Sequence, residues 1–446
     1  MVFFPKSILE KIRNRPSLAK IANNIVWLFF DKLLRLGGGL VVGVWIARYL
    51  GPEQFGLLNF VTAFVGLFVA FAGLGLKGVV IRDLVNKPDS SFEILGTALM
   101  LKVAGGVAAY VLVAIMMFWL RPDDVFTQTI TLIIGSTLIF KVGEIVTYWF
   151  ESQVLSKYVV WVQNGCFLAA SVIKVVLILN EAPLKAFVWV IASEALFVAV
   201  LLIWVFAIRA GRLQRLRFTF QRAKSLLSDS WPLMLSGISM TVYMNIDQVM
   251  LGQLANDEAV GVYSAAAKVS QVWYFIPMII VSSVFPAILK AKMRDETQYY
   301  QRLQRLFDLM AWLSFMVAVP LTLVATPLMV IVFGDLYEQS GAVLAIHVWA
   351  SVFVFMGVAG GKWFLAENRQ ILNFYRKALG AIANIGLNLI LIPLYGPIGA
   401  AIATIISYAI VEFIYDVFQR ETRCLFIMKL QSLNLYASAQ RLICKI

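Results

Sequence analysis

The chain has 446 residues, of which 61% are hydrophobic and 14% are charged, and its formal net charge is +13. A water-soluble protein of this length could not cover so much apolar surface, so the composition excludes a soluble fold and indicates a polytopic membrane protein. Each crossing needs about 20 apolar residues, so about a dozen helices would use the whole chain and leave no room for a globular catalytic domain.

Apolar segments separated by short polar breaks predict an all-α fold of twelve transmembrane helices. In chain order they cover residues 24–50, 57–80, 95–119, 126–150, 158–180, 184–208, 230–252, 260–289, 309–333, 341–365, 372–393 and 396–419. Residues 1–23 are polar and basic, and the apolar run after them is long and lacks a small-residue cleavage site. They predict a cytoplasmic amphipathic lead-in, not a signal peptide.

The lysines and arginines of the breaks lie almost entirely on one side of the predicted membrane. The outer breaks contain only Arg48, Arg121 and Lys185, whereas the inner breaks and both ends are rich in cations. The positive-inside rule therefore predicts that both termini are cytoplasmic. The same placement explains the net charge through contact with anionic membrane lipids, so we expect no nucleic-acid partner.

The longest inner loop divides the chain into two halves of six helices. The predicted parts are an N-terminal bundle at 24–208, a basic cytoplasmic linker at 209–229, a C-terminal bundle at 230–420 and a cytoplasmic amphipathic tail at 421–446. A weak repeat supports the division, because residues 51–59 and 256–264 share an acid and a glycine at a constant offset. Two such halves, related by an axis along the membrane normal, would enclose a central cavity.

Three stretches of sequence resemble a known family. Residues 47–60 read ARYLGPEQFGLLNF, residues 243–248 read YMNIDQ and residues 261–268 read GVYSAAAK. They are similar to the bacterial polysaccharide repeat-unit transporters, the O-antigen flippases of the multidrug/oligosaccharidyl-lipid/polysaccharide flippase superfamily. Local chemistry offers an alternative for the first stretch, since Gly51 and Pro52 by themselves predict the end of one helix and the start of the next.

The resemblance implies a function as well as a fold. It implies a bacterial inner-membrane protein that moves undecaprenyl-diphosphate-linked oligosaccharide, such as an O-antigen unit, from the cytoplasmic to the periplasmic leaflet by alternating access. A polysaccharide polymerase and a chain-length regulator are the further partners it implies. The related peptidoglycan-precursor flippases have two additional helices, whereas this chain ends in a short amphipathic segment from Leu425 to Ile446.

Charged side chains inside the segments are costly in lipid, so they should face a cavity or one another. The candidate cations for binding the diphosphate are Lys268, Arg35, Lys141, Lys77 and Arg48. The position of Lys268 after three alanines resembles the cavity-facing basic residue of the lipid II flippases, and snorkelling to the interface is the alternative. Arg35 lies four residues after Asp31 and Lys141 three before Glu144, so charge-balanced packing within each pair is the alternative there.

The candidate acids for coupling transport to an ion gradient are Asp247, Glu194 and Glu144. The chain has no Gly-x-x-x-x-Gly-Lys-Ser/Thr loop, which argues against ATP as the energy source. Asp247 lies about five residues from the outer end of its segment, so a position at the rim is one interpretation. The others are a pair with Lys268 of the next helix, or a site that binds a proton or a sodium ion. Glu194 has no local partner, so it should lie against a cation of another helix or titrate. Glu144 is the weakest candidate because Lys141 neutralises it.

Several other charges have simpler interpretations. Lys77, Lys102 and Lys362 lie near inner helix ends, where snorkelling is favoured over a role at the inner mouth. Arg376 and Lys429 belong to the inner-loop and tail cations that set the topology. The acids Glu412 and Asp416, four residues apart, are unassigned.

Two other functions compete with a glycan flippase. A drug/cation antiporter of the same superfamily would favour an acidic cavity, whereas the buried positions of this chain are more basic than acidic. A membrane-bound polymerase or glycosyltransferase would need a sizeable outer loop, and the largest outer break, residues 334–340, is too short. One histidine and three cysteines at unrelated spacings offer no metal or disulfide pattern. We therefore expect no enzyme, no cofactor and no metal.

Overall fold

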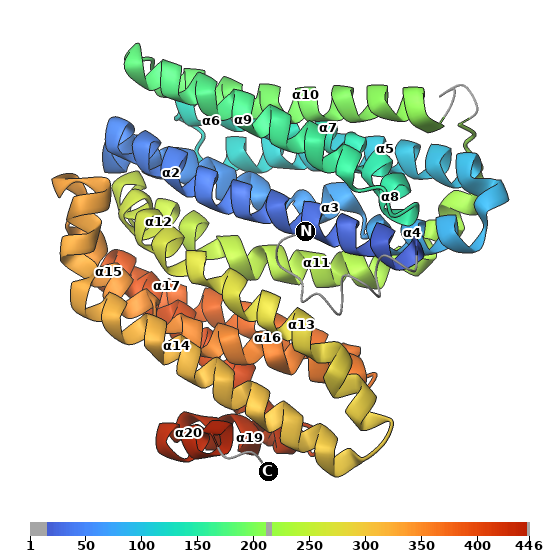
Figure 1. The fold of residues 1–446 in the computed structure, drawn as a ribbon. Coiled ribbons are helices and arrows are strands. Elements are labelled where there is room, and N and C mark those ends of the chain that lie inside the picture. The colour runs from blue at the N-terminus through green and yellow to red at the C-terminus, as the bar shows by residue number, and fades with distance from the viewer. Residues whose placement is uncertain (1–15, 211–215, 444–446) are drawn as a thin grey trace. The chain divides into compact units, whose positions relative to one another are not determined.

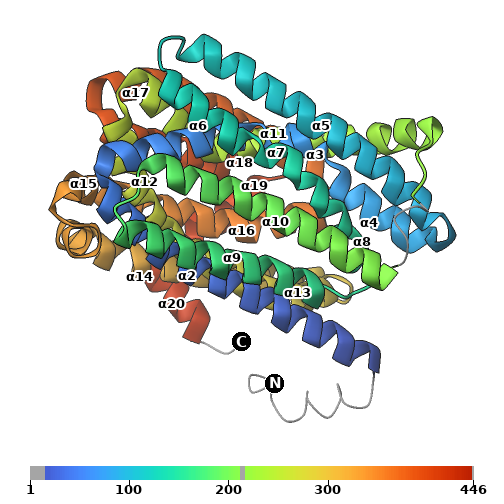
Figure 2. The same cartoon turned by 90° about the horizontal axis from the view of Figure 1, so that it is seen from above.

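The structure is a computed structural model that describes residues 16–210 and 216–443 (Figures 1 and 2). Both ranges are helical and contain no strand, which confirms the predicted all-α fold. Residues 1–15 of the predicted lead-in and 211–215 of the predicted linker lie outside the described residues.

The chain forms two compact units, and each includes residues that are distant in the sequence. The first unit comprises Met1–Tyr49 and Phe64–Thr241, and the second comprises Leu50–Ala63 and Val242–Ile446. The second unit thus takes a segment from the N-terminal half. These limits differ from the predicted bundles because they follow packing, so the predicted boundaries at 208 and 230 remain a prediction.

The first unit contains parts of α2 (Pro16–Leu67) and α11 (Phe220–Leu254), and eight α-helices between them. These are α3 (Val69–Gly73), α4 (Leu76–Asn86), α5 (Ser91–Leu120), α6 (Val125–Gly135), α7 (Thr137–Phe140), α8 (Glu144–Ser152), α9 (Lys157–Leu179) and α10 (Leu184–Ala210), with 3₁₀ turns at Pro88–Ser90 and Lys141–Gly143. The apolar core of this unit includes Leu76, Val80, Phe150 and Leu202.

The second unit contains the remaining helices of the chain. These are α12 (Asp257–Gln271), α13 (Phe275–Lys292), α14 (Glu296–Phe333), α15 (Gln339–His347), α16 (Ala350–Ala366), α17 (Gln370–Ala409), the π-helix η6 (Ile410–Ile414), α18 (Tyr415–Phe418), α19 (Arg423–Leu433) and α20 (Leu435–Ile443), with 3₁₀ turns at Val272–Tyr274 and Asp335–Tyr337. Its core includes Phe307, Phe355, Phe364 and Leu425, the last of which belongs to the predicted tail.

Nine helical stretches of the described ranges are long and apolar enough to cross a membrane, by length and composition. Two of them contain a glycine with non-helical backbone, Gly51 in α2 (φ 71°) and Gly396 in α17 (φ 55°). Each of these stretches therefore consists of two helices, as the predicted breaks there require. The seventh predicted segment lies in the more polar α11, so all twelve predicted segments fall on helices and the chain is a multi-pass membrane protein.

The two copies of the predicted repeat contact each other within the second unit. A methyl group added at Gly56 would lie 1.7 Å from the Asp257 carbonyl oxygen, and one added at Gly261 would lie 1.9 Å from the Pro52 carbonyl oxygen. Each glycine therefore permits a close approach of backbone to backbone. The contact is reciprocal, since Pro52 and Gly56 occupy the same repeat positions as Asp257 and Gly261. Such reciprocity is what a pseudo-two-fold relation between the two turns produces.

Candidate functional site

A buried carboxylate without a cationic partner marks the candidate site of the second unit. Asp247 of α11 is 5% exposed. Asn388 Nδ2 donates to its Oδ1 at 2.6 Å, while Thr404 Oγ1 and Tyr263 OH donate to its Oδ2 at 2.8 and 3.0 Å. Within the described ranges, no lysine or arginine lies at ion-pair distance from this carboxylate. Its charge is thus held by neutral donors alone.

Further polar side chains of α17 extend this network. Asn384 Oδ1 accepts a hydrogen bond from Asn388 Nδ2 at 3.0 Å, and Asn384 Nδ2 donates to Ser407 Oγ at 3.4 Å. The Oδ1 atom of Asn388 is buried and has no hydrogen-bond partner. Carboxylate, amide and hydroxyl oxygens are the ligands that hard cations prefer. The site can therefore hold a proton on the carboxylate or a small cation among its oxygens.

The local sequence explains how one helical element supplies both sides of the site. Asn388 and Thr404 lie on the two limbs of α17, which the non-helical Gly396 separates. Asn384 and Asn388 are four residues apart, so they share one face of the first limb. No cluster of three His, Cys, Asp or Glu side chains in the described ranges could hold a metal ion, so the site depends on one acid and neutral oxygens.

The predicted alternative for Asp247, an ion pair with Lys268, is not formed. The Lys268 ammonium instead lies over the Phe55 ring, 4.2 Å from its centroid. No carboxylate of the described ranges lies within ion-pair distance of Lys268, which is partly buried. The physical reason is that neutral donors already satisfy the hydrogen-bonding capacity of the Asp247 carboxylate.

The first unit brings together two of the predicted acids and one predicted cation. Lys141, Glu144 and Glu194 line one cavity of about 350 Å³. Glu144 binds Lys141 Nζ at 3.3 Å and also binds Lys102, which is 1% exposed. The predicted snorkelling of Lys102 is therefore wrong, because Glu144 offers this ammonium a buried partner inside the unit.

The other predicted site residues of the first unit are either paired with an opposite charge or exposed. Glu194 lies 3.4 Å from Lys174 of α9, so the expectation of a cation from another helix is met. Arg35 pairs with Asp31 at 2.9 Å. The remaining two cations, Lys77 and Arg48, are exposed, and Lys77 pairs with Glu151 at 2.9 Å. Their roles in binding substrate remain predictions.

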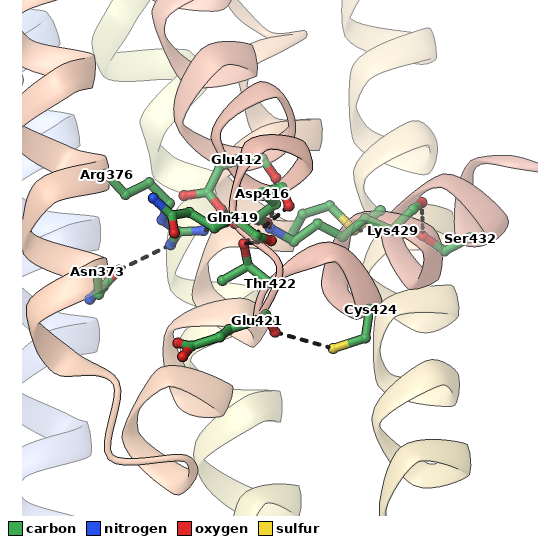
Figure 3. A network of polar contacts seen from close by, with 11 residues as sticks. Asn373, Arg376, Glu412, Asp416, Gln419, Glu421, Thr422, Cys424, Lys429 and Ser432 are labelled. Carbon is green, nitrogen blue, oxygen red and sulfur yellow. Dashed lines mark hydrogen bonds and ion pairs between the residues drawn. The ribbon is translucent and has the colours of Figure 1, made fainter.

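The sequence reasoning missed a cluster of four buried charges in the second unit, shown in Figure 3. Arg376 and Lys429 are 1% and 0% exposed, so assigning them to loops as topology signals was wrong. Arg376 Nη1 lies 3.0 Å from Glu412 Oε2, and Lys429 Nζ lies 2.9 Å from Asp416 Oδ2. The signal that could have found them was the pair of acids on an apolar helix, which requires cations nearby.

Two solved membrane proteins share the fold of this chain. The structure aligns with the lipid II flippase MurJ in its inward closed conformation at a TM-score of 0.70, with 14% identity, covering 95% of this chain and 94% of that chain. It also aligns with an inward-facing multidrug resistance MATE family transporter at a TM-score of 0.65, with 13% identity, covering 95% and 100% of the two chains. At these identities the likeness establishes the fold alone.

The sequence comparisons identify the family. The sequence model of the polysaccharide biosynthesis protein family matches residues 21–292, which is more than half of the chain. The chain therefore belongs to the polysaccharide biosynthesis protein family. A relative from Haloferax volcanii, named probable low-salt glycan biosynthesis flippase Agl15, is 22% identical over 404 residues, which cover 87% of this chain and 81% of that protein.

Proposed function

We propose that the protein is a flippase that moves a lipid-linked oligosaccharide across the membrane by alternating access, driven by an ion that binds at Asp247. Family membership and the name of the archaeal relative support a glycan substrate. The lipid carrier that the sequence resemblance implies is undecaprenyl diphosphate, with O-antigen or another surface polysaccharide as cargo. The direction is from the cytoplasmic to the outer leaflet, with both termini cytoplasmic.

The observation that carries the coupling proposal is the environment of Asp247. A gradient-driven cycle needs a site whose occupancy differs between the inward- and outward-open states. Glu144 and Glu194 are each already neutralised by lysines, at Lys102 and Lys141 for the first and at Lys174 for the second. Asp247 has only neutral partners, so an ion that binds there changes the net charge of the second unit.

The substrate contact that we propose is Lys268. Its ammonium rests on the Phe55 ring rather than on a carboxylate, so its charge is available to a diphosphate. Arg35, Lys141 and Lys77 are already paired with acids, so they would have to exchange partners to bind the same group. We therefore place Lys268 first among the cations.

Transport by purified protein in liposomes tests this function. The probe is a prenyl-diphosphate oligosaccharide with a fluorophore on its sugar that an external reductant bleaches. We expect transfer between leaflets that Lys268→Ala reduces at least tenfold and that Lys268→Arg largely retains, since the diphosphate needs a cation. Lys224→Ala, at an exposed position near the start of α11, is the matched control.

Two outcomes would contradict the proposal. The first is full activity of Lys268→Ala at equal protein levels, which would leave Lys268 as a packing lysine. The second is the absence of glycolipid transfer together with gradient-dependent uptake of a cationic dye such as ethidium, which would favour a drug antiporter with the MATE fold.

A further inference from the structure

Within the second unit, one ladder of polar side chains connects the Asp247 site with the buried charges of Figure 3. The first limb of α17 presents Arg376, Gly380, Asn384 and Asn388, each four residues from the next and therefore on one face. The facing limb continues from Thr404 through η6 to Asp416. The two ends of the ladder are the candidate ion site and the charge cluster.

Close packing joins the two limbs between these ends. Asn384 donates to Ser407 at 3.4 Å, and a methyl group added at Gly380 would lie 2.1 Å from Val411 Cγ2. The ring of Tyr243 stacks on that of Tyr408, with centroids 4.7 Å apart. A displacement of the second limb at Asp416 would therefore be transmitted toward Thr404, because packed interiors yield little.

Lys429 of α19 holds the irregular part of this limb. Its ammonium donates to the Glu412 backbone oxygen at 2.7 Å, to Glu412 Oε2 at 3.3 Å and to Asp416 Oδ2 at 2.9 Å. Glu412 lies inside the π-helix and Asp416 lies just after it. A π-turn interrupts the regular ladder of backbone hydrogen bonds, and such turns are frequent at functional positions. Lys429 therefore holds the limb at two points, one inside the π-turn and one just after it.

Stability alone does not account for this cluster. Four charges are buried, and Arg376 Nε and Asp416 Oδ1 have no hydrogen-bond partner. Apolar side chains of similar volume would pack there without the cost of desolvating these charges. Room for the charges also requires glycine in α16, since a methyl group at Gly357 would lie 2.5 Å from Glu412 Oε1.

We propose that Lys429 of the C-terminal tail, α19 and α20, is a positioning residue. Together with Arg376 of the first limb of α17, it holds the second limb where Thr404 completes the Asp247 site. The tail has a second anchor, in which Arg441 of α20 makes a bidentate pair with Asp308 of α14 at 2.7 and 2.8 Å. Figure 1 shows α19 and α20 beside α14. This second anchor binds the same tail to α14 and not to α17. Its removal therefore tests the docking of the tail without removing the contacts that position the second limb of α17.

Two matched double variants test the proposal. Lys429→Met with Asp416→Asn, and Arg441→Met with Asp308→Asn, each remove one cation and one carboxylate, so neither leaves the removed partner's charge unpaired. Hydrogen exchange of the purified protein, read by mass spectrometry over residues 400–409, reports the opening of the limb directly. The first variant should exchange about tenfold faster there, and the second should match the wild type.

A functional readout accompanies the exchange measurement and rests on the proposed ion coupling. The ion concentration that half-saturates transport should rise about tenfold in the first variant only, which is the size of a typical coupling effect. Equal exchange over residues 400–409 in both variants would overturn the positioning role. Ion-independent transport by the wild type would refute the coupling of the proposed function, while the exchange comparison would still decide the role of the tail.

Discussion

The Asp247 site and the cluster around Lys429 both include side chains from the two limbs of α17 and its continuation, but their buried charges have opposite arrangements. At Asp247 one carboxylate is held by three neutral donors, from Asn388, Thr404 and Tyr263. In the cluster two buried carboxylates face two buried cations. In the proposed function the first site accepts a positive ligand, whereas the second site contains cations that the protein itself supplies.

The proposed transport cycle uses both kinds of site. A site that exchanges an ion must be left incomplete by the protein, because a resident lysine would compete with that ion. A segment that carries such a site must be held in place elsewhere, and buried ion pairs contribute conformational specificity in some proteins. Substitutions in either site should lower the free energy of unfolding by different amounts, the most in the charge cluster and the least at Asp247.

The largest effect should follow removal of one partner from the buried cluster. Lys429→Met leaves Glu412 and Asp416 with Arg376 alone, and breaking a buried pair costs about 3–5 kcal/mol of unfolding free energy. Arg369→Met is the control, since its pair with Glu421 is largely exposed and should contribute less than about 1 kcal/mol. Unfolding of the detergent-purified protein measures both, and equal losses would contradict the contrast between buried and exposed pairs.

An intermediate effect should follow crowding of the same cluster without removal of a charge. The methyl group of Gly357→Ala would displace Glu412, and overpacking of this kind costs about 1–3 kcal/mol. A methyl at Gly360 would lie 3.4 Å from Lys429 Nζ, at ordinary contact distance, so Gly360→Ala should be tolerated. The same unfolding measurement compares the two, and a larger loss for Gly360→Ala would refute the described packing of Glu412.

A smaller effect on stability should follow the loss of one donor at the ion site. Thr404→Val removes the hydrogen bond to Asp247 Oδ2, which costs about 1–2 kcal/mol, whereas Thr404→Ser keeps the hydroxyl. The valine variant should also need more ion to reach half-maximal transport. If valine and serine behave alike in ion titrations of transport, the threonine hydroxyl is not part of the site.

The sequence predicted much of the fold because the membrane simplifies the problem. Length and apolarity locate the crossings, and Gly51 with Pro52 marks the turn between the first two. Local spacing likewise predicted the pairs Arg35–Asp31 and Lys141–Glu144, which both form.

The partners of Asp247 could not be predicted from local spacing, because they are distant from it in the sequence. Asn388 and Thr404 contact Asp247 across 141 and 157 residues of sequence. Lys429 follows the last predicted crossing, so the sequence places it among the cations of the cytoplasmic tail. In the structure α19 packs into the core of the second unit through Leu425. From the sequence alone, a lysine in such a tail is predicted to be exposed, because its buried acidic partners are not known.

The most direct test of the coupling site compares gradient-driven transport by the wild type, Asp247→Asn and Glu194→Gln in liposomes with imposed sodium or proton gradients. Asparagine keeps the shape and a hydrogen-bond acceptor but removes the charge, so we expect Asp247→Asn to transport at a rate that no gradient changes. Glu194→Gln should keep the gradient dependence of the wild type, because Glu194 is already paired with Lys174. Unchanged gradient dependence in Asp247→Asn would contradict the account.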